Sequence, residues 1–152
     1  TVTGPGVDRP RNLMVPLGTP LRALLEHCGL RSETVQVIAG GPMMGAPQKS
    51  IDVPVLKGTS GILCLDGPAT VNLQEFPCIR CGRCVRACPM FLNPARLARL
   101  VRAGRAEGAG EIHLMNCFEC ASCSYVCPSG IPLVQWMRVG KTELRNLQRK
   151  DP

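Results

Sequence analysis

Short apolar runs in the first part of the chain predict a small module of strands. Residues 2–3, 14–17 and 35–38 are apolar runs bounded by Gly, Pro and polar residues, which is the pattern of short strands. Two further apolar segments follow at residues 53–55 and 61–65. We therefore expect this part of the chain to fold as a small α/β module.

One helix is predicted inside this module. Four residues recur at the spacing of a single apolar helix face: Leu21, Leu24, Leu25 and Cys28. Thr19 is expected to cap the helix, with Pro20 at its first position and Gly29 just beyond its end. Cys28 is therefore expected to be a core thiol and not a metal ligand, and Cys64 in the last apolar segment is interpreted in the same way.

Helical patterns dominate the later part of the chain. Asn93 can cap a helix that starts at Pro94 and stops at Gly104, and a second, shorter helix is predicted over residues 106–115. A long helix is predicted over residues 132–149. Its expected buried stripe consists of Leu133, Met137, Gly140, Leu144 and Leu147.

The composition narrows the class of protein. The chain has 152 residues and a net charge of +7 at pH 7, which suggests an acidic partner, nucleic acid or an anionic membrane face. No apolar run approaches the ~20 residues that a membrane-spanning helix needs, and no targeting segment is visible. Because the sequence starts at Thr1 without Met, we expect it to be a piece of a longer protein.

Eight of the ten cysteines form two runs of identical spacing, C-x2-C-x2-C-x3-C-P. The runs are Cys78, Cys81, Cys84 and Cys88 before Pro89, and Cys117, Cys120, Cys123 and Cys127 before Pro128. This is the bacterial ferredoxin spacing for [4Fe–4S] clusters. A Cys at every third position of a tight loop can bring three thiolates onto one face of a cubane. The sequence therefore predicts two [4Fe–4S] clusters and a reducing compartment.

The ligands of each cluster are expected to come from both runs. The Pro after each fourth Cys turns that residue away, so that it can ligate the other cluster. The predicted ligands of cluster one are Cys78, Cys81, Cys84 and Cys127. Those of cluster two are Cys117, Cys120, Cys123 and Cys88.

Other uses of these cysteines fit the spacing less well. Zinc sites use separated Cys pairs, or Cys with His, in sets of four, and the lone His113 is interpreted as structural. A disulfide framework belongs to small secreted chains. Buried cysteines without a ligand role would not recur with this period.

Several charged or glycine-rich stretches carry weaker signals. The loop at residues 40–45 either approaches a ligand or is a tight turn that needs positive φ, and we favour the turn. Residues 57–60 could contact an anion, although a solvated turn is the simpler interpretation. A run of arginines almost free of acids is expected to meet an acidic partner or the membrane surface, or else to be a solvated face: Arg80, Arg83, Arg86, Arg96, Arg99, Arg102 and Arg105.

Local charge also suggests an order of cluster potentials. The loop of cluster one carries Arg80, Arg83 and Arg86, whereas that of cluster two carries Glu119 and no base. Because reduction adds negative charge, we expect cluster one to have the higher potential.

Several motifs together resemble the RnfC family, the peripheral C subunits of the Rnf ion-translocating electron transport complex. The stretches that carry the resemblance are residues 2–7, 40–45, 52–55, 57–63, 78–84 and 123–133. The resemblance implies an α+β chain, with a β-grasp (SLBB-like) module at 1–50 and a return segment and linker at 51–70. Residues 71–152 would be an all-helical ferredoxin domain with two [4Fe–4S] clusters, which agrees with a helix after each cysteine run.

The resemblance also implies a function. The family is similar to the flavin-bearing subunit of respiratory complex I, with an FMN- and NADH-binding domain ahead of these two parts. The Gly-rich nucleotide and flavin loops of the family have no match in this sequence, so FMN and NADH are expected only in the full-length protein. This chain would be an electron relay with no catalytic residues of its own, in a membrane-associated NADH:ferredoxin oxidoreductase coupled to ion translocation.

Partners and alternatives follow from the same resemblance. The expected partners are the ferredoxin-like B subunit and the membrane subunits, at the cytoplasmic side of the bacterial inner membrane. Alternatives are a PduS-like cobalamin reductase and a heterodisulfide-reductase-type iron–sulfur subunit. A nucleic-acid-binding protein with structural clusters is a remote alternative, since the basic stretch has almost no interleaved aromatic residues.

Overall fold

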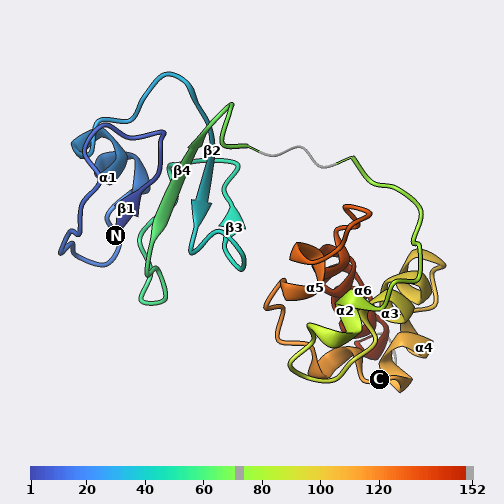
Figure 1. The fold of residues 1–152 in the computed structure, drawn as a ribbon. Helices are drawn as coiled ribbons and strands as arrows, with labels where there is room; N and C mark the ends of the chain where they lie inside the picture. Colours follow the sequence, from blue (N-terminus) through green and yellow to red (C-terminus); the bar gives the residue numbers. More distant parts are fainter. Residues whose placement is uncertain (71–73, 150–152) are drawn as a thin grey trace. The chain divides into compact units, whose positions relative to one another are not determined.

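The computed structural model describes residues 1–70 and 74–149. The chain forms two compact units, Thr1–Asn72 and Leu73–Pro152. The first is a mixed sheet with one helix, and the described residues of the second contain helices (Figure 1). The chain therefore has an α+β fold.

The first unit is built on a four-stranded sheet in the order β1-β4-β2-β3. Its strands are β1 (Val2–Thr3), β2 (Thr34–Ala39), β3 (Ala46–Pro47) and β4 (Ile62–Asp66). β1 pairs with β4 in parallel, and the other pairs are antiparallel (Figure 1). Part of the segment expected as a return segment and linker therefore lies inside the sheet, as β4.

The strand predicted at residues 14–17 is wrong. Met14 is fully exposed, while Leu13 and Val15 pack against the core, so the apolar run lies along the surface without a ladder partner. The segment that pairs with β1 comes earlier: Val2 and Arg11 exchange backbone hydrogen bonds of 2.9 and 3.0 Å. Pro10 and Pro16, which lack a backbone N–H, flank the region and limit the ladder that could form there.

Helix α1 (Leu21–His27) forms where it was predicted, but its cap differs. The Thr19 hydroxyl donates to the Pro16 carbonyl at 2.8 Å and does not cap the helix. The first-turn N–H groups of Leu21 and Arg22 instead donate to the backbone carbonyls of residues 53 and 51, each at 2.9 Å. A neighbouring segment thus satisfies the donors that a side-chain cap would otherwise take.

The predicted apolar face of α1 is confirmed. Leu21, Leu24, Leu25 and Cys28 are all buried. Cys28 and Cys64 are both 0% exposed within the first unit, as expected for core thiols.

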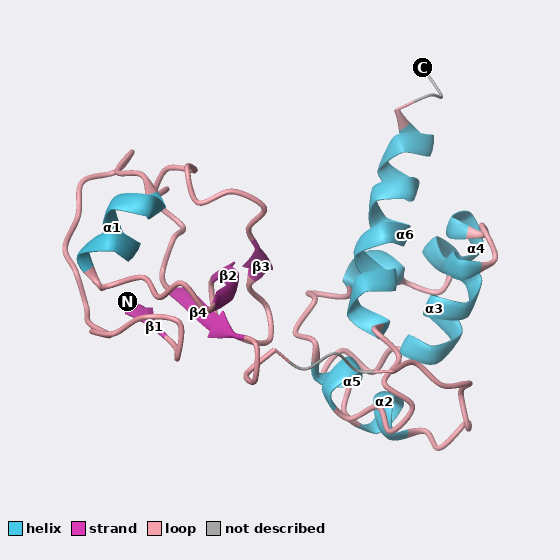
Figure 2. Cartoon of the chain, turned by 90° about the horizontal axis from the view of Figure 1, so that it is seen from above, coloured by secondary structure: helices cyan, strands magenta, loops and turns pink. Residues whose placement is uncertain are grey.

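The second unit packs its helices around α6 (Leu133–Gln148). The other helices are α2 (Arg83–Arg86), α3 (Pro94–Arg102), α4 (Ala106–Glu111), the 3₁₀ helix η1 (Leu114–Asn116) and α5 (Ser122–Tyr125). Figure 2 shows α3 and α4 beside α6, with the short helices α2 and α5 close together. No helix of the described residues has both the length and the apolar character needed to cross a bilayer.

The cap predicted for α3 is confirmed. The Asn93 Oδ1 accepts a hydrogen bond of 3.0 Å from the Arg96 N–H, and Pro94 occupies the first position of the helix. By contrast, the single helix predicted over residues 106–115 is wrong. It ends at Glu111, and His113 then adopts a left-handed φ of 68°, which redirects the chain so that the buried Leu114 begins η1.

The buried stripe of α6 is confirmed except at its last position. Leu133, Met137, Gly140 and Leu144 are buried, whereas Leu147 is 38% exposed. A Cβ at Gly140 would lie 2.4 Å from the Val101 Cγ2 atom. The glycine thus permits close contact between α6 and α3. The residues at this contact belong to the hydrophobic core of the second unit, against which the cysteines pack.

Candidate metal centre

The two cysteine loops have the same backbone conformation at matching positions. Arg80 and Gly82 in the first run have φ values of 56° and 72°, and Glu119 and Ala121 in the second run both have 63°. Gly82 precedes α2 and Ala121 precedes α5 in the same way. Left-handed residues at these positions curl each loop, even where the residue is not glycine. The repeat in sequence is therefore also a repeat in backbone geometry.

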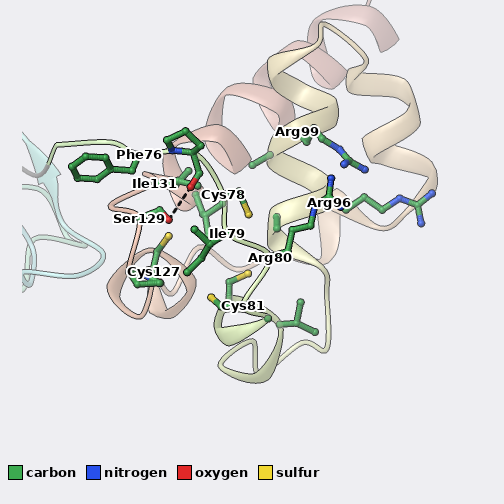
Figure 3. Close-up of a pocket in the computed structure, with 18 of the residues that line it drawn as sticks. Phe76, Cys78, Ile79, Arg80, Cys81, Arg96, Arg99, Cys127, Ser129 and Ile131 are labelled. Carbon is green, nitrogen blue, oxygen red and sulfur yellow. Dashed lines mark hydrogen bonds between the residues drawn. The ribbon is translucent and has the colours of Figure 1, made fainter.

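The thiols expected to hold cluster one lie around one cavity. A cavity of about 830 Å³ is lined by Cys78, Cys81, Cys84 and Cys127. Figure 3 shows Cys78, Cys81 and Cys127 around it. Cys88, the fourth cysteine of the first run, is not among its lining residues. The structure thus brings three cysteines of one run together with the last cysteine of the other.

Two hydrogen bonds between distant segments hold Cys127 at this cavity. The Phe76 N–H donates to the Ser129 carbonyl at 2.9 Å, and the buried Ser129 hydroxyl donates to the Pro77 carbonyl at 3.1 Å (Figure 3). The chain entering the first run is therefore held against the chain leaving the second. Sequence reasoning missed Ser129, because a lone Ser after a Cys-Pro pair gives no signal of a contact 52 residues away.

The thiols expected to hold cluster two lie deeper in the unit. Cys123 is buried, and Cys88 and Cys117 pack against the same core. Burial raises the pKa of the Cys123 thiol to about 11, and negative charge on Cys117 and Cys120 contributes to that rise. Cys88 belongs to the turn after α2, and its sulfur accepts a 3.4 Å hydrogen bond from the Leu92 N–H.

Backbone N–H groups point at several of these sulfurs. The Cys117 sulfur accepts from the Glu119 N–H at 3.4 Å. Burial raises the pKa of the Cys84 thiol, while backbone N–H groups of Ala95 and Val85 lower it and negative charge on Cys127 raises it further. Cys84 and Cys127, one from each run, line the same cavity. Such donors stabilise thiolates that ligate iron.

The donor set fits [4Fe–4S] clusters better than a single metal ion. Among residues 1–70 and 74–149, no three His, Cys, Asp or Glu side chains converge on one ion. The four thiolates of a cubane each bind a different iron atom, so they need not meet at one point. Eight thiols in two matching curled loops, with backbone donors to the sulfurs, are suited to two such clusters.

The charge expected near cluster two is corrected by the structure. Glu119 is not an isolated acid, because its carboxylate oxygens lie 2.9 Å from the Lys141 Nζ and 3.1 Å from the Arg138 Nε. Lys141 is buried and also donates to the Cys117 carbonyl oxygen. Burial raises the pKa of the Glu119 carboxyl, but Lys141 and Arg138 outweigh it and hold the pKa below its ordinary value. The second loop itself contains one acid and no base, as expected, but α6 places two cations beside that acid.

The arginine run does not form one face. Arg102 lies 2.6 Å from Glu75 and stacks 4.9 Å from the centre of the Trp136 ring, so it holds the unit together. Arg83 and Arg86 lie with Tyr125 at a separate hollow. Arg80, Arg96 and Arg99 line the cysteine cavity together with Arg102.

Comparisons with known proteins agree with this division of the chain. The family model of the SLBB domain matches residues 1–47, and that of the 4Fe-4S dicluster domain matches residues 69–131. The C subunit of the ion-translocating oxidoreductase complex of Rhodobacter capsulatus is 46% identical over 151 residues, which are 99% of this chain and 29% of that protein. Over nearly its whole length the chain is thus similar to the C subunit of an ion-translocating oxidoreductase complex, and it combines a match to the SLBB domain with a match to the 4Fe-4S dicluster domain.

Two further C subunits show a comparable degree of identity. The C subunit of the proton-translocating ferredoxin:NAD(+) oxidoreductase complex of Clostridium ljungdahlii is 42% identical over 95% of the chain. The corresponding subunit of the Na(+)-translocating complex of Acetobacterium woodii is 40% identical over 99% of the chain. The chain spans 32% and 34% of these two proteins. It thus corresponds to about a third of such a subunit.

Proposed function

We propose that this chain is an electron-transfer module that relays single electrons through two [4Fe–4S] clusters. Cys78, Cys81, Cys84 and Cys127 would hold cluster one, and Cys117, Cys120, Cys123 and Cys88 would hold cluster two. The observation that carries this proposal is the position of Cys127, which lines one cavity with three cysteines of the other run. The second unit would then be an all-helical ferredoxin domain and the first a β-grasp (SLBB-like) module.

The residues of the chain would hold and tune the clusters without breaking bonds. When bound, each cluster supplies one-electron redox chemistry. The loops present thiolates, and the N–H groups of Glu119 and Leu92 donate to the sulfurs of Cys117 and Cys88. Helix α6 brings cations to the second loop, where they offset negative charge. No side chain is required as an acid, base or nucleophile.

The names of its relatives support a setting for this module. We place it in a membrane-associated Rnf-type NADH:ferredoxin oxidoreductase, between a flavin and NADH domain elsewhere in the same protein and the other subunits of the complex. Its partners would be the ferredoxin-like B subunit and the membrane subunits, with the chain peripheral on the cytoplasmic side. The electron flow would be coupled to ion translocation, in line with the names of its relatives.

Anaerobic reconstitution tests the proposed function. We expect about eight iron atoms per chain and reversible reduction by dithionite with EPR signals of reduced [4Fe–4S] clusters. A Cys28→Ala variant, which removes a core thiol outside the runs, should keep the full iron content. One zinc per run with no reducible signal would disprove the relay.

A further inference from the structure

Four arginines line the cavity of the first set of thiols, and three of them lack an ion-pair partner among the described residues. Arg80, Arg96 and Arg99 are exposed, and within the described residues their guanidinium groups have no ion-pair partner (Figure 3). Glu75 is the acid that lines the same cavity, and it is already paired with Arg102. The mouth of this cavity is therefore positively charged, without an internal counter-charge for these three groups.

The thiols at this mouth are also the accessible ones. Cys78 and Cys81 are exposed, whereas Cys123 in the second set is buried. Ile79 beside them is 68% exposed and Phe76 is 52% exposed. Exposed apolar side chains next to unpaired cations are typical of small, wet interfaces between redox proteins. The combination favours contact with another protein at the edge of the first set.

We propose that this mouth surface, formed by Arg80, Arg96, Arg99, Ile79 and Phe76, is the docking site of an acidic redox protein. The inference rests on the proposed electron-transfer function and names the side of the chain where electrons cross to a partner. Charge complementarity selects the occupant: unpaired guanidinium groups attract carboxylates, and the apolar pair provides contact once the partner arrives. One electron leaves the partner and enters the chain, or the reverse. No bond breaks.

The test is a stopped-flow measurement with an acidic flavodoxin in its hydroquinone state as the probe. The reconstituted chain is mixed with this probe, and oxidation of the flavin by one electron is followed by absorbance across a salt series. The test variant is Arg96→Glu with Arg99→Glu. We expect its second-order rate constant at low salt to fall at least about tenfold, with a flatter salt dependence, because steering is screened beyond the Debye length.

The control variant carries the same change of charge elsewhere in the unit. Arg105→Glu with Arg145→Glu alters two exposed arginines outside the cavity and should stay within about threefold of the unmodified chain. Equal rates for both variants would overturn the docking surface. So would loss of binding to phosphatidylglycerol vesicles by the test variant at an unchanged flavodoxin rate, since that would assign the surface to the membrane.

Dithionite reduction of the same samples separates this inference from the proposed function. Full reduction of all three proteins, together with a selective loss of flavodoxin rate in the test variant, supports the surface. Full reduction with no selective loss overturns the surface and leaves the relay standing. Absence of dithionite-reducible clusters in the unmodified chain overturns both.

Discussion

The charge around Glu119 depends on side chains that are distant in the sequence. It lies between two cysteines of the second run, yet α6 supplies Lys141 and Arg138 to its carboxylate. Lys141 is 6% exposed, so its charge is poorly screened by solvent. The net charge of these three groups is therefore positive, although the second loop itself contains no base, and the cations come from α6.

Substitutions at this trio should move the potential of cluster two in opposite directions. Lys141→Met removes a nearby cation and should lower that potential by roughly 40–100 mV, as expected for one charge at ~8 Å. Glu119→Gln removes an anion and should raise it. EPR-monitored redox titration measures both shifts, with the potential of cluster one as the internal reference. Shifts of the same sign in both variants would show that packing, not charge, is responsible.

A cysteine substitution tests the crossed ligation. Cys88→Ser should damage the cluster held by Cys117, Cys120 and Cys123, because Cys88 does not line the cavity of the first set. The measurement is EPR of the reduced variant, assigned against Cys81→Ser and Cys120→Ser. We expect Cys88→Ser to lose the same signal as Cys120→Ser. Loss of the signal that Cys81→Ser removes would mean that each run ligates its own cluster.

At the scale of helices, two glycines of the second unit have different surroundings. A Cβ added at Gly108 in α4 would have no neighbouring atom within 4 Å, whereas Gly140 in α6 lies against Val101 and Leu114. The same Gly→Ala change should therefore have opposite effects. At Gly108 the added methyl group reduces the backbone entropy that α4 loses on folding. At Gly140 it forces the atoms of α6 and α3 apart.

These effects are measurable as changes in the free energy of unfolding. Gly108→Ala should stabilise the chain by about 0.5–1 kcal/mol, and Gly140→Ala should destabilise it by about 1–3 kcal/mol. Denaturant titration of both variants, with iron content matched, gives the two values. A stable Gly140→Ala variant would mean that α3 and α6 can separate at little cost.

At the scale of the whole molecule, the two compact units carry different chemistry. The described part of the first unit holds Cys28 and Cys64 in its core, and all eight cysteines of the runs belong to the second unit. Metal binding contributes folding free energy only to the part that provides the ligands. The first unit should therefore be insensitive to loss of iron.

Hydrogen exchange of the holo and iron-free chains tests this separation. After chelation under anaerobic conditions, we expect amide protection to fall in residues 78–88 and 117–127 and in the helices that pack on them. Protection in β2 and β4 should stay the same. A parallel loss of protection in the first unit would show that its fold depends on the clusters.

Local patterns in the sequence determined several of the elements and the type of site. Three features depend on residues only a few positions apart, which stay close together in any fold. They are the cap at Asn93, the apolar face of α1 and the curled cysteine loops. The duplicated spacing likewise specifies thiolates at a repeated interval and so the class of cofactor. These features were predictable because their physics is local.

Contacts between distant residues were decided by the tertiary structure alone. Lys141 in α6 donates a hydrogen bond to Glu119, 22 positions away. Ser129, in the turn after α5, donates one to Pro77, 52 positions away. Arg96, Arg99 and Arg102 all line the cysteine cavity, but packing pairs Arg102 with Glu75 and leaves the other two without an ion-pair partner among the described residues. The spacing of apolar residues indicates which side of a helix is buried, but the residues that contact this side depend on how the helices pack together. The charge around each set of thiols therefore follows from the fold.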